Sequence, residues 1–221
     1  QSEFAYSTEH KEELIKALRS GQYDAVVANP PYITVKDKAL NAGYRERFSH
    51  LKGKYQLTAP FMELLFQLAK RGDGMTQAGW AGQITSNAFM KREFGTPLIE
   101  DLLTALDLQL IIDTSGAYIP GHGTPTVILV GRNQSPVRSE LRAVLGKQGE
   151  PGRPQDAAMG QVWRAIVDEV DHPGTETAWI SVADLPRRQL RSHPWSLAGG
   201  GVASVLPQIE ASRTRLSDVT T

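Results

Sequence analysis

The feature that most constrains the fold is a series of short apolar runs, rich in β-branched residues, that alternate with segments of helical periodicity. The runs are residues 23–28, 80–85, 108–112 and 126–130. The helical patterns are residues 7–20, 58–69 and 97–106. Runs this apolar are typical of strands buried on both faces of a parallel sheet. The order predicts an α/β fold with a mainly parallel sheet, whose last two strands form an antiparallel hairpin at its edge.

After Asn133 the composition shifts toward glycine, proline and charged residues. We expect one strand at residues 141–145, a helix at 162–170 and another strand at 177–182, while the C-terminal residues show no clear period. The shift predicts a boundary near residue 135 between a main domain and a C-terminal extension.

Composition narrows the classes of function. The chain has 24 Lys and Arg against 24 Asp and Glu, so its formal net charge is zero and any contact with nucleic acid must come from local patches. It has no cysteine, which excludes a disulfide framework, a thiolate zinc site and a thiol nucleophile. No metal site is expected. No apolar run is long enough to span a membrane, and Gln1 begins neither a signal peptide nor an initiator sequence, so we expect a piece of a longer cytoplasmic protein without a membrane partner.

The stretch DAVVANPPYI, residues 24–33, ends a predicted strand in Asn29-Pro30-Pro31-Tyr32. Ligands of open α/β sheets bind beyond the carboxyl ends of the strands, where this tetrapeptide lies. The two prolines stiffen the backbone and remove two N–H donors, which leaves the Asn29 side-chain oxygen and the Pro30 carbonyl as acceptors. A flat group that carries an NH₂ matches this corner, and Tyr32 adds an aromatic face for stacking. The alternative is a rigid turn that leaves the strand and has no further role.

Two groups of basic residues stand out. Residues 36–54 are predicted to form a long loop with six basic side chains against two acidic ones. The basic residues are Lys36, Lys38, Arg45, Arg47, Lys52 and Lys54. They predict contacts with DNA phosphates, the alternative being a solvated loop. Near the C-terminus, Arg187, Arg188 and Arg191 begin a target-recognition region or form a surface cluster without a specific role.

Four stretches resemble a known family. DAVVANPPYI is similar to motif IV of the amino-group methyltransferases that use S-adenosylmethionine, and GWAGQITSNAFM is similar to their next strand. LIIDTSGAYIPGHGTPTVILVG resembles the last strand hairpin of adenine-N6 DNA methyltransferases. Together with PWSLAGGG, these stretches resemble the large adenine-specific methyltransferases of bacterial phage defence, the phage-growth-limitation or BREX type.

The resemblance implies a partial Rossmann-like methyltransferase fold and a role for each matched residue. Asn29 and Pro30, followed by Pro31, would hold the N6 amino group of a flipped adenine, with Asn29 also beside the cofactor, and Tyr32 would stack on the base. A second aromatic contact would come from the neighbourhood of Tyr118 and Ile119, with His122 as a further substrate contact. Implied partners are double-stranded DNA and other phage-defence proteins.

The resemblance also predicts what the chain lacks. No strand followed by a Gly-rich turn, the usual cradle for S-adenosylmethionine, precedes residue 24. We therefore expect residues 1–135 to be the C-terminal half of a methyltransferase catalytic domain, and residues 136–221 an extension that leads into a target-recognition region. Such a fragment would bind the cofactor poorly and be inactive alone.

Two other functions are compatible with the sequence. The first is another methyltransferase with this tetrapeptide, one that acts on a glutamine amide in a protein or on the guanine-N2 group of ribosomal RNA. The long stretches between Tyr32 and Thr58 and after Val130 favour DNA over these substrates. The second is a non-catalytic binding module of a defence complex, in which Asn29 would be dispensable.

Overall fold

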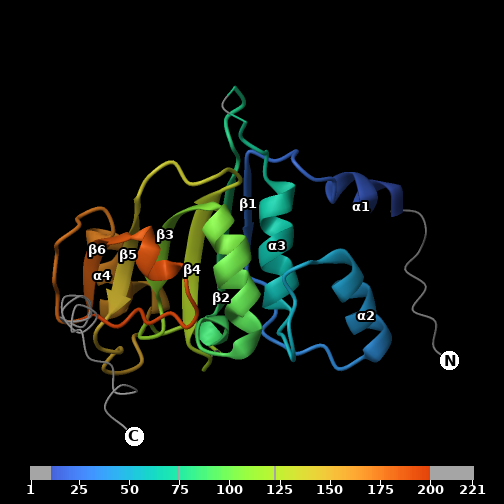
Figure 1. The fold of residues 1–221 in the computed structure, drawn as a ribbon. Coiled ribbons are helices and arrows are strands. Elements are labelled where there is room, and N and C mark those ends of the chain that lie inside the picture. Colours follow the sequence, from blue (N-terminus) through green and yellow to red (C-terminus); the bar gives the residue numbers. More distant parts are fainter. Residues whose placement is uncertain (1–10, 74, 122, 200–221) are drawn as a thin grey trace, which may run out of the picture.

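The computed structural model describes residues 11–73, 75–121 and 123–199, which fold around one mixed sheet (Figure 1). Its strands are β1 (Ala25–Ala28), β2 (Trp80–Ser86), β3 (Asp107–Asp113), β4 (Thr126–Arg132), β5 (Glu140–Gly146) and β6 (Ile180–Pro186). The α-helices are α1 (Lys11–Ala17), α2 (Lys38–Arg47), α3 (Thr58–Leu68) and α4 (Gln161–Glu169). Shorter helical segments are Asn87–Met90, Glu93–Gly95, Leu98–Leu103, Ala157–Met159 and Arg187–Leu190. The α/β class is confirmed.

The strand order is β1-β2-β4-β3-β5-β6. β1 pairs in parallel with β2, and β3 with β5, whereas β4 is antiparallel to both β2 and β3, and β6 to β5. The predicted antiparallel pair of β3 and β4 is present, but its position at the edge of a mainly parallel sheet was wrong. After β4 the chain adds β5 beside β3 and then β6 beside β5, so the hairpin lies inside a mixed sheet.

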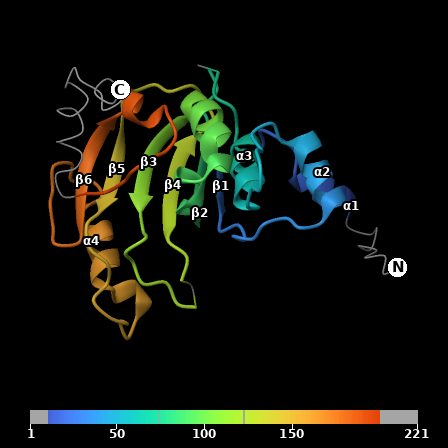
Figure 2. The same cartoon turned by 60° about the horizontal axis from the view of Figure 1, so that its bottom comes forward.

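Each face of the sheet carries its own apolar core. On one face, α3 and the Leu98–Leu103 segment pack over the sheet through residues such as Met62, Phe66 and Leu98. On the other face, Val162 and Ile166 of α4 pack on β3, β5 and β6. Figure 2 shows α4 and the Leu98–Leu103 segment on opposite sides of the sheet. The helices predicted at 58–69 and 162–170 are thus confirmed, although Leu57, not Thr58, is the N-cap of α3.

β1 is the edge strand of the described sheet, and this corrects the prediction of a strand buried on both faces. Ala25 and Val27 are exposed, with 83% of the Val27 surface accessible, while Val26 and Ala28 pack partly against the core. The run AVVA has the composition of an interior strand, yet within the described residues β2 is its one neighbour. Its apolar side chains therefore lack the cover that their composition predicts.

The segment predicted as a basic loop contains helix α2, so that prediction was wrong. Asp37 caps the helix, since its side chain accepts a hydrogen bond from the Leu40 backbone N–H at 2.7 Å. The Asn41 side-chain oxygen accepts from Arg45 Nε one turn later, and Tyr44 packs against the core. Capping, the side-chain bond within the helix and the contact of Tyr44 with the core support a helix whose charges hide its period in the sequence.

The C-terminal part continues the same sheet. β5 matches the strand predicted at 141–145, while β6 begins three residues later than the predicted 177 and runs to Pro186. Strands from both sides of the predicted boundary at residue 135 belong to one sheet, because β5 pairs with β3. The division into functional parts at residues 135 and 136 stays a prediction. None of the helices that the structure describes is long and apolar enough to cross a membrane.

Gly79 provides a test of how β1 is held. A Cβ atom on Gly79 would lie 2.4 Å from the Tyr23 carbonyl oxygen, which leads into β1, and 2.7 Å from the Lys70 backbone nitrogen, which donates to that carbonyl. We expect Gly79→Ala to lower the free energy of unfolding by about 3 kcal/mol, the upper range for overpacking. Urea unfolding followed by circular dichroism measures this.

The matched control is Gly82→Ala, three residues later and within β2, where a Cβ atom would meet its nearest neighbour, Val27 Cγ1, at 3.4 Å. This variant should unfold at or slightly above the wild-type urea concentration, because alanine suits a strand better than glycine. Equal losses in the two variants would contradict the steric argument.

Candidate functional site

Asn29, Pro30, Pro31 and Tyr32 lie at the carboxyl end of β1, as predicted. Ala28 pairs with Gln83, and β2 continues to Ser86, so the end of β2 stands beside the segment that begins at Asn29. Pro30 is buried, whereas Asn29 and Pro31 are exposed. The buried proline anchors the corner and leaves the Asn29 side chain accessible from outside.

The exit from this corner is tied to the start of α3. The Leu57 backbone N–H donates to the Ile33 carbonyl at 2.8 Å, and Thr34 forms an isolated antiparallel bridge with Gln56. The corner is therefore held at both ends, by the β1–β2 pairing before Asn29 and by these contacts after Tyr32. A corner fixed in this way presents its acceptors without first having to be ordered.

The Asn29 side-chain oxygen accepts a hydrogen bond from the Tyr32 hydroxyl at 2.8 Å. Burial raises the pKa of Tyr32, so the hydroxyl stays protonated at neutral pH and can donate. The side chain of Asn29 is not turned inward onto backbone, which keeps it available to a ligand. An incoming NH₂ group can use the second lone pair of the amide oxygen or displace the Tyr32 hydroxyl.

The second predicted contact region lies at the same edge but farther along the sheet. Tyr118 and Ile119 follow β3, whose carboxyl end faces the same way as that of β1, and both are half-buried. Three strand spacings separate β1 from β3, which is about 14 Å. The Tyr118 carbonyl accepts from Trp163 Nε1 at 3.1 Å, and the Arg153 guanidinium lies 5.9 Å from the Tyr118 ring. His122 lies outside the described residues.

Two polar residues of β2 that the sequence analysis did not select lie next to the corner. Gln83, directly across from Ala28, is buried with both side-chain amide atoms unpartnered, and the buried Thr85 hydroxyl is also unpartnered. Buried polar groups without hydrogen bonds are costly and call for a reason, often a functional one. Polar residues in the middle of an apolar strand were the signal available in the sequence.

The six basic residues predicted to contact DNA differ in whether their side chains already have partners within the protein. Arg45 donates to the Leu51 and Gly53 carbonyls, and Lys52 forms an ion pair with Glu93 at 3.0 Å. The Arg47 guanidinium lies over the Phe48 ring. Within the described part of the chain, exposed Lys36, Lys38 and Lys54 have no side-chain partner. These three are the most available for phosphate.

A buried carboxylate, Glu63 of α3, anchors the segment after α2. It accepts hydrogen bonds from the Ser49 and His50 backbone N–H groups at 3.3 and 3.2 Å, from His50 Nδ1 at 2.8 Å and from Gln67 Nε2 at 3.1 Å. Glu63 is 5% exposed. The contacts fix the basic segment to the helix that follows the Asn29 corner. Among the described residues there is no cluster of three or more acidic or His side chains suited to a metal ion.

The described residues do not fit a complete S-adenosylmethionine cradle. They supply the acceptor corner, but the free side of β1, where a strand with a Gly-rich turn would lie, has no neighbour within the described ranges. The exposed Val27 marks the same gap on one face of the sheet. The corner can therefore position an amino group, while the cofactor needs residues beyond those described.

Comparisons with known proteins give one consistent family. The model of the Eco57I restriction-modification methylases matches residues 1–119. The chain is 53% identical, over 219 residues, to the adenine-specific methyltransferase PglX of Streptomyces coelicolor; the match covers 96% of this chain and 18% of PglX. The resemblance stated from the motifs is thereby confirmed.

Solved structures share the fold. A modification subunit of a putative type I restriction enzyme from Vibrio vulnificus superposes with a TM-score of 0.60 at 12% identity, over 84% of this chain and 39% of that one. A type I methyltransferase subunit from Streptococcus thermophilus gives 0.52 at 16% identity, over 73% and 34%. The chain thus spans less than half of each relative.

Glu63 allows a test of the anchor. We expect Glu63→Leu to lower the free energy of unfolding by about 3 kcal/mol, because the Ser49 and His50 N–H groups lose their charged acceptor inside the protein. Glu63→Gln should lose less, since one side-chain oxygen remains. Urea unfolding measures both.

Glu93→Gln is the control, because it removes a carboxylate from an exposed ion pair. Its effect should stay within about 1 kcal/mol. If Glu63→Leu were as harmless as Glu93→Gln, the anchoring role of Glu63 would be disproved.

Proposed function

The chain belongs to the Eco57I restriction-modification methylase family, and from this premise we propose that it is the catalytic-loop part of a site-specific DNA adenine-N6 methyltransferase of a bacterial phage-defence system. The observation that carries the proposal is the exposed Asn29 amide in a rigid proline corner at the carboxyl end of β1. The 53% identity to PglX supports adenine as the substrate.

The chemistry of the corner suits an exocyclic amine. The Asn29 oxygen and the Pro30 carbonyl each accept one hydrogen of a planar NH₂ group. Two such bonds increase the electron density on the amino nitrogen and direct its lone pair away from the acceptors. S-adenosylmethionine, the usual donor of such methylases, would supply a methyl group activated by a sulfonium. The corner orients the nitrogen by hydrogen bonding, and no strong base is required.

The adenine must leave the duplex to reach Asn29. Tyr32 has an aromatic ring beside the amide and can stack on the flipped base, although its hydroxyl must first give up or share the Asn29 oxygen. Lys36, Lys38 and Lys54, on the segment that follows, are available to contact the phosphates on either side of the flipped nucleotide. Tyr118 and Ile119, at the same end of the sheet but about 14 Å from β1, are proposed as a more distant part of the substrate region.

We propose that the free edge of β1 pairs with a strand of the longer natural protein that carries the cofactor cradle. Three observations support this: β1 has the composition of an interior strand, Val27 is 83% exposed, and the chain spans 18% of PglX. The described chain alone would then bind S-adenosylmethionine weakly and transfer little or no methyl. A cytoplasmic location, with double-stranded DNA and other defence proteins as partners, is part of the same proposal.

The decisive experiment detects N6-methyladenine in host DNA by long-read sequencing, with and without the full-length gene. In the full-length protein, Asn29→Ala should lower methyl transfer by about 10²- to 10³-fold, the usual effect of removing one preorganised hydrogen-bonding group from a reaction centre. Asn29→Asp should retain part of the activity, because an acceptor oxygen remains. Wild-type methylation by Asn29→Ala would favour a non-catalytic binding module instead.

Tyr32 separates stacking from hydrogen bonding. Tyr32→Ala should weaken transition-state binding about 5- to 150-fold, the effect expected from the loss of one base–aromatic stack. Tyr32→Phe keeps the ring and frees the Asn29 oxygen, so its kcat/KM should equal or exceed that of wild type. A Tyr32→Phe variant as impaired as Tyr32→Ala would show that the hydroxyl, not the ring, is required.

A further inference from the structure

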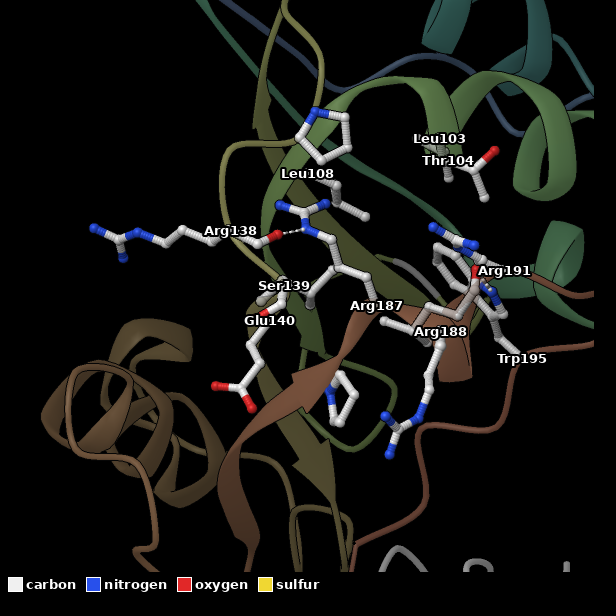
Figure 3. Close-up of a pocket in the computed structure, with 14 residues that line it drawn as sticks. Leu103, Thr104, Leu108, Arg138, Ser139, Glu140, Arg187, Arg188, Arg191 and Trp195 are labelled. Atoms are coloured by element: carbon white, nitrogen blue, oxygen red, sulfur yellow. Dashed lines mark hydrogen bonds between the residues drawn. The ribbon is translucent and has the colours of Figure 1, made fainter.

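A cavity lies at the end of the sheet opposite to Asn29. It has a volume of about 480 Å³ and is lined by the start of β3, the start of β5 and the end of β6, together with Arg187–Leu190 (Figure 3). β3 and β5 are parallel and begin at this end of the sheet, while the Asn29 corner lies where β1 ends. Nothing in the proposed methyl transfer uses this cavity.

The lining of the cavity is strongly basic. Arg138, Arg187, Arg188 and Arg191 line it, against one acidic side chain, Glu140. The whole chain has a formal net charge of zero, so this excess is local. Arg138, Arg188 and Arg191 are exposed, and within the described chain their guanidinium groups have no partner. Unpaired positive charges gathered around a hollow attract a polyanion.

Arg187, one of the three arginines near the C-terminus, is held in place by hydrogen bonds. Its Nη2 donates to Asp107 Oδ1 at 2.7 Å and its Nε to the Arg138 carbonyl at 2.7 Å. Asp107 is 0% exposed and also accepts from Gln109 and Gln134. Burial lowers the pKa of Arg187, and the Asp107 carboxylate opposes that shift. The buried ion pair holds the backbone of Arg187–Leu190 in place, so the neighbouring arginines project from a rigid base.

The directions of the side chains decide the kind of ligand. Figure 3 shows the guanidinium groups spread apart: Arg138 points away from the centre, Arg191 toward Thr104, and Arg188 to the opposite side. They do not converge on one small anion. A second cavity of about 480 Å³ shares Arg138 and Arg187 with the first and extends the hollow. Separate charges along an extended hollow match successive phosphates of a strand.

Among the described residues, the one aromatic side chain that lines the cavity is not placed for stacking on a base. Trp195 lines the cavity but is 3% exposed, with its ring packed against Phe89 and its Nε1 bonded to the Leu190 carbonyl. Its face is not available for stacking. Contacts from arginine to phosphate, without stacking or base-edge contacts, give binding that is independent of sequence.

We propose that this arginine cavity is a second nucleic-acid contact, which binds the sugar–phosphate backbone of DNA independently of sequence at the end of the sheet opposite to the Asn29 corner. The identity of the nucleic acid as DNA rests on the proposed function; the preference for phosphate rests on the cavity. Its effect is to hold flanking or neighbouring DNA on the enzyme, while the methylated adenine is held elsewhere.

The test compares two variants of the full-length protein. Arg188→Gln/Arg191→Gln removes two cavity charges but leaves Arg187 and its ion pair intact. Arg19→Gln/Arg164→Gln removes two exposed charges outside the cavity and outside the Asn29 corner. Fluorescence anisotropy with a duplex that lacks the methylated site measures Kd over a range of salt concentrations, and thermal melting checks that both variants fold.

For the cavity variant we expect Kd to rise about tenfold and the slope of log Kd against log salt to fall by about 2, one unit for each lost phosphate contact. Kd and slope should stay at wild-type values for the control variant. With DNA that contains the target site for methylation, the cavity variant should have a higher KM and an unchanged kcat, because the two substituted arginines do not contact the reacting base.

Unchanged Kd and salt slope in the cavity variant would overturn the inference, and so would equal losses in both variants, which would indicate a general charge effect. Failure of the proposed function is distinguishable. If the wild-type protein methylates no DNA but the cavity variant still loses duplex affinity, the second contact stands and the methyltransferase assignment falls. If methylation is normal and duplex affinity is unaffected, only the cavity proposal falls.

Discussion

The parallel pairing of β1 with β2 is the constraint on which the site depends. β1 is four residues long and, among the described strands, pairs with β2 alone. The Trp80 backbone N–H donates to the Asp24 carbonyl, and the Lys70 N–H to the Tyr23 carbonyl, each at 2.8 Å, so the chain is held just before the strand starts. A shift of the register by one residue would turn Val26 and Ala28 away from the core. Position and orientation of Asn29 follow from that register.

The corner that follows the carboxyl end of β1 is held by several contacts. Pro30 is buried, the exit is bonded to the start of α3, and Glu63 of the same helix secures the segment after α2. One contact inside the corner can be exchanged, the hydrogen bond from Tyr32 to the Asn29 oxygen. In the proposed function, an incoming amino group would compete with this hydrogen bond for the Asn29 oxygen, while the contacts that hold the rest of the corner stay in place.

Local patterns predicted what local physics controls. The apolar runs located β2, β3, β4 and β5, and the prolines located the corner, because both signals act over a few neighbouring residues. Pairing between distant segments could not be predicted from the sequence. The β3–β4 hairpin lies inside the sheet because β5 pairs with β3. Arg187 is held in place by Asp107, which lies 80 residues earlier in the chain. The prediction that β1 is buried on both faces was wrong because Ala25 and Val27 are exposed in the described chain, although a run this apolar is typical of an interior strand. α2 was missed because its charges hid its period.

The two prolines have a consequence for the solubility of the protein. An uncovered strand edge is a template on which identical chains can add strand upon strand toward aggregates. Pro30 and Pro31 have no backbone N–H, so no ladder of that kind can grow past residue 29. The prolines that make the Asn29 corner rigid therefore also limit the unpaired edge of β1, as described, to the four residues of the strand.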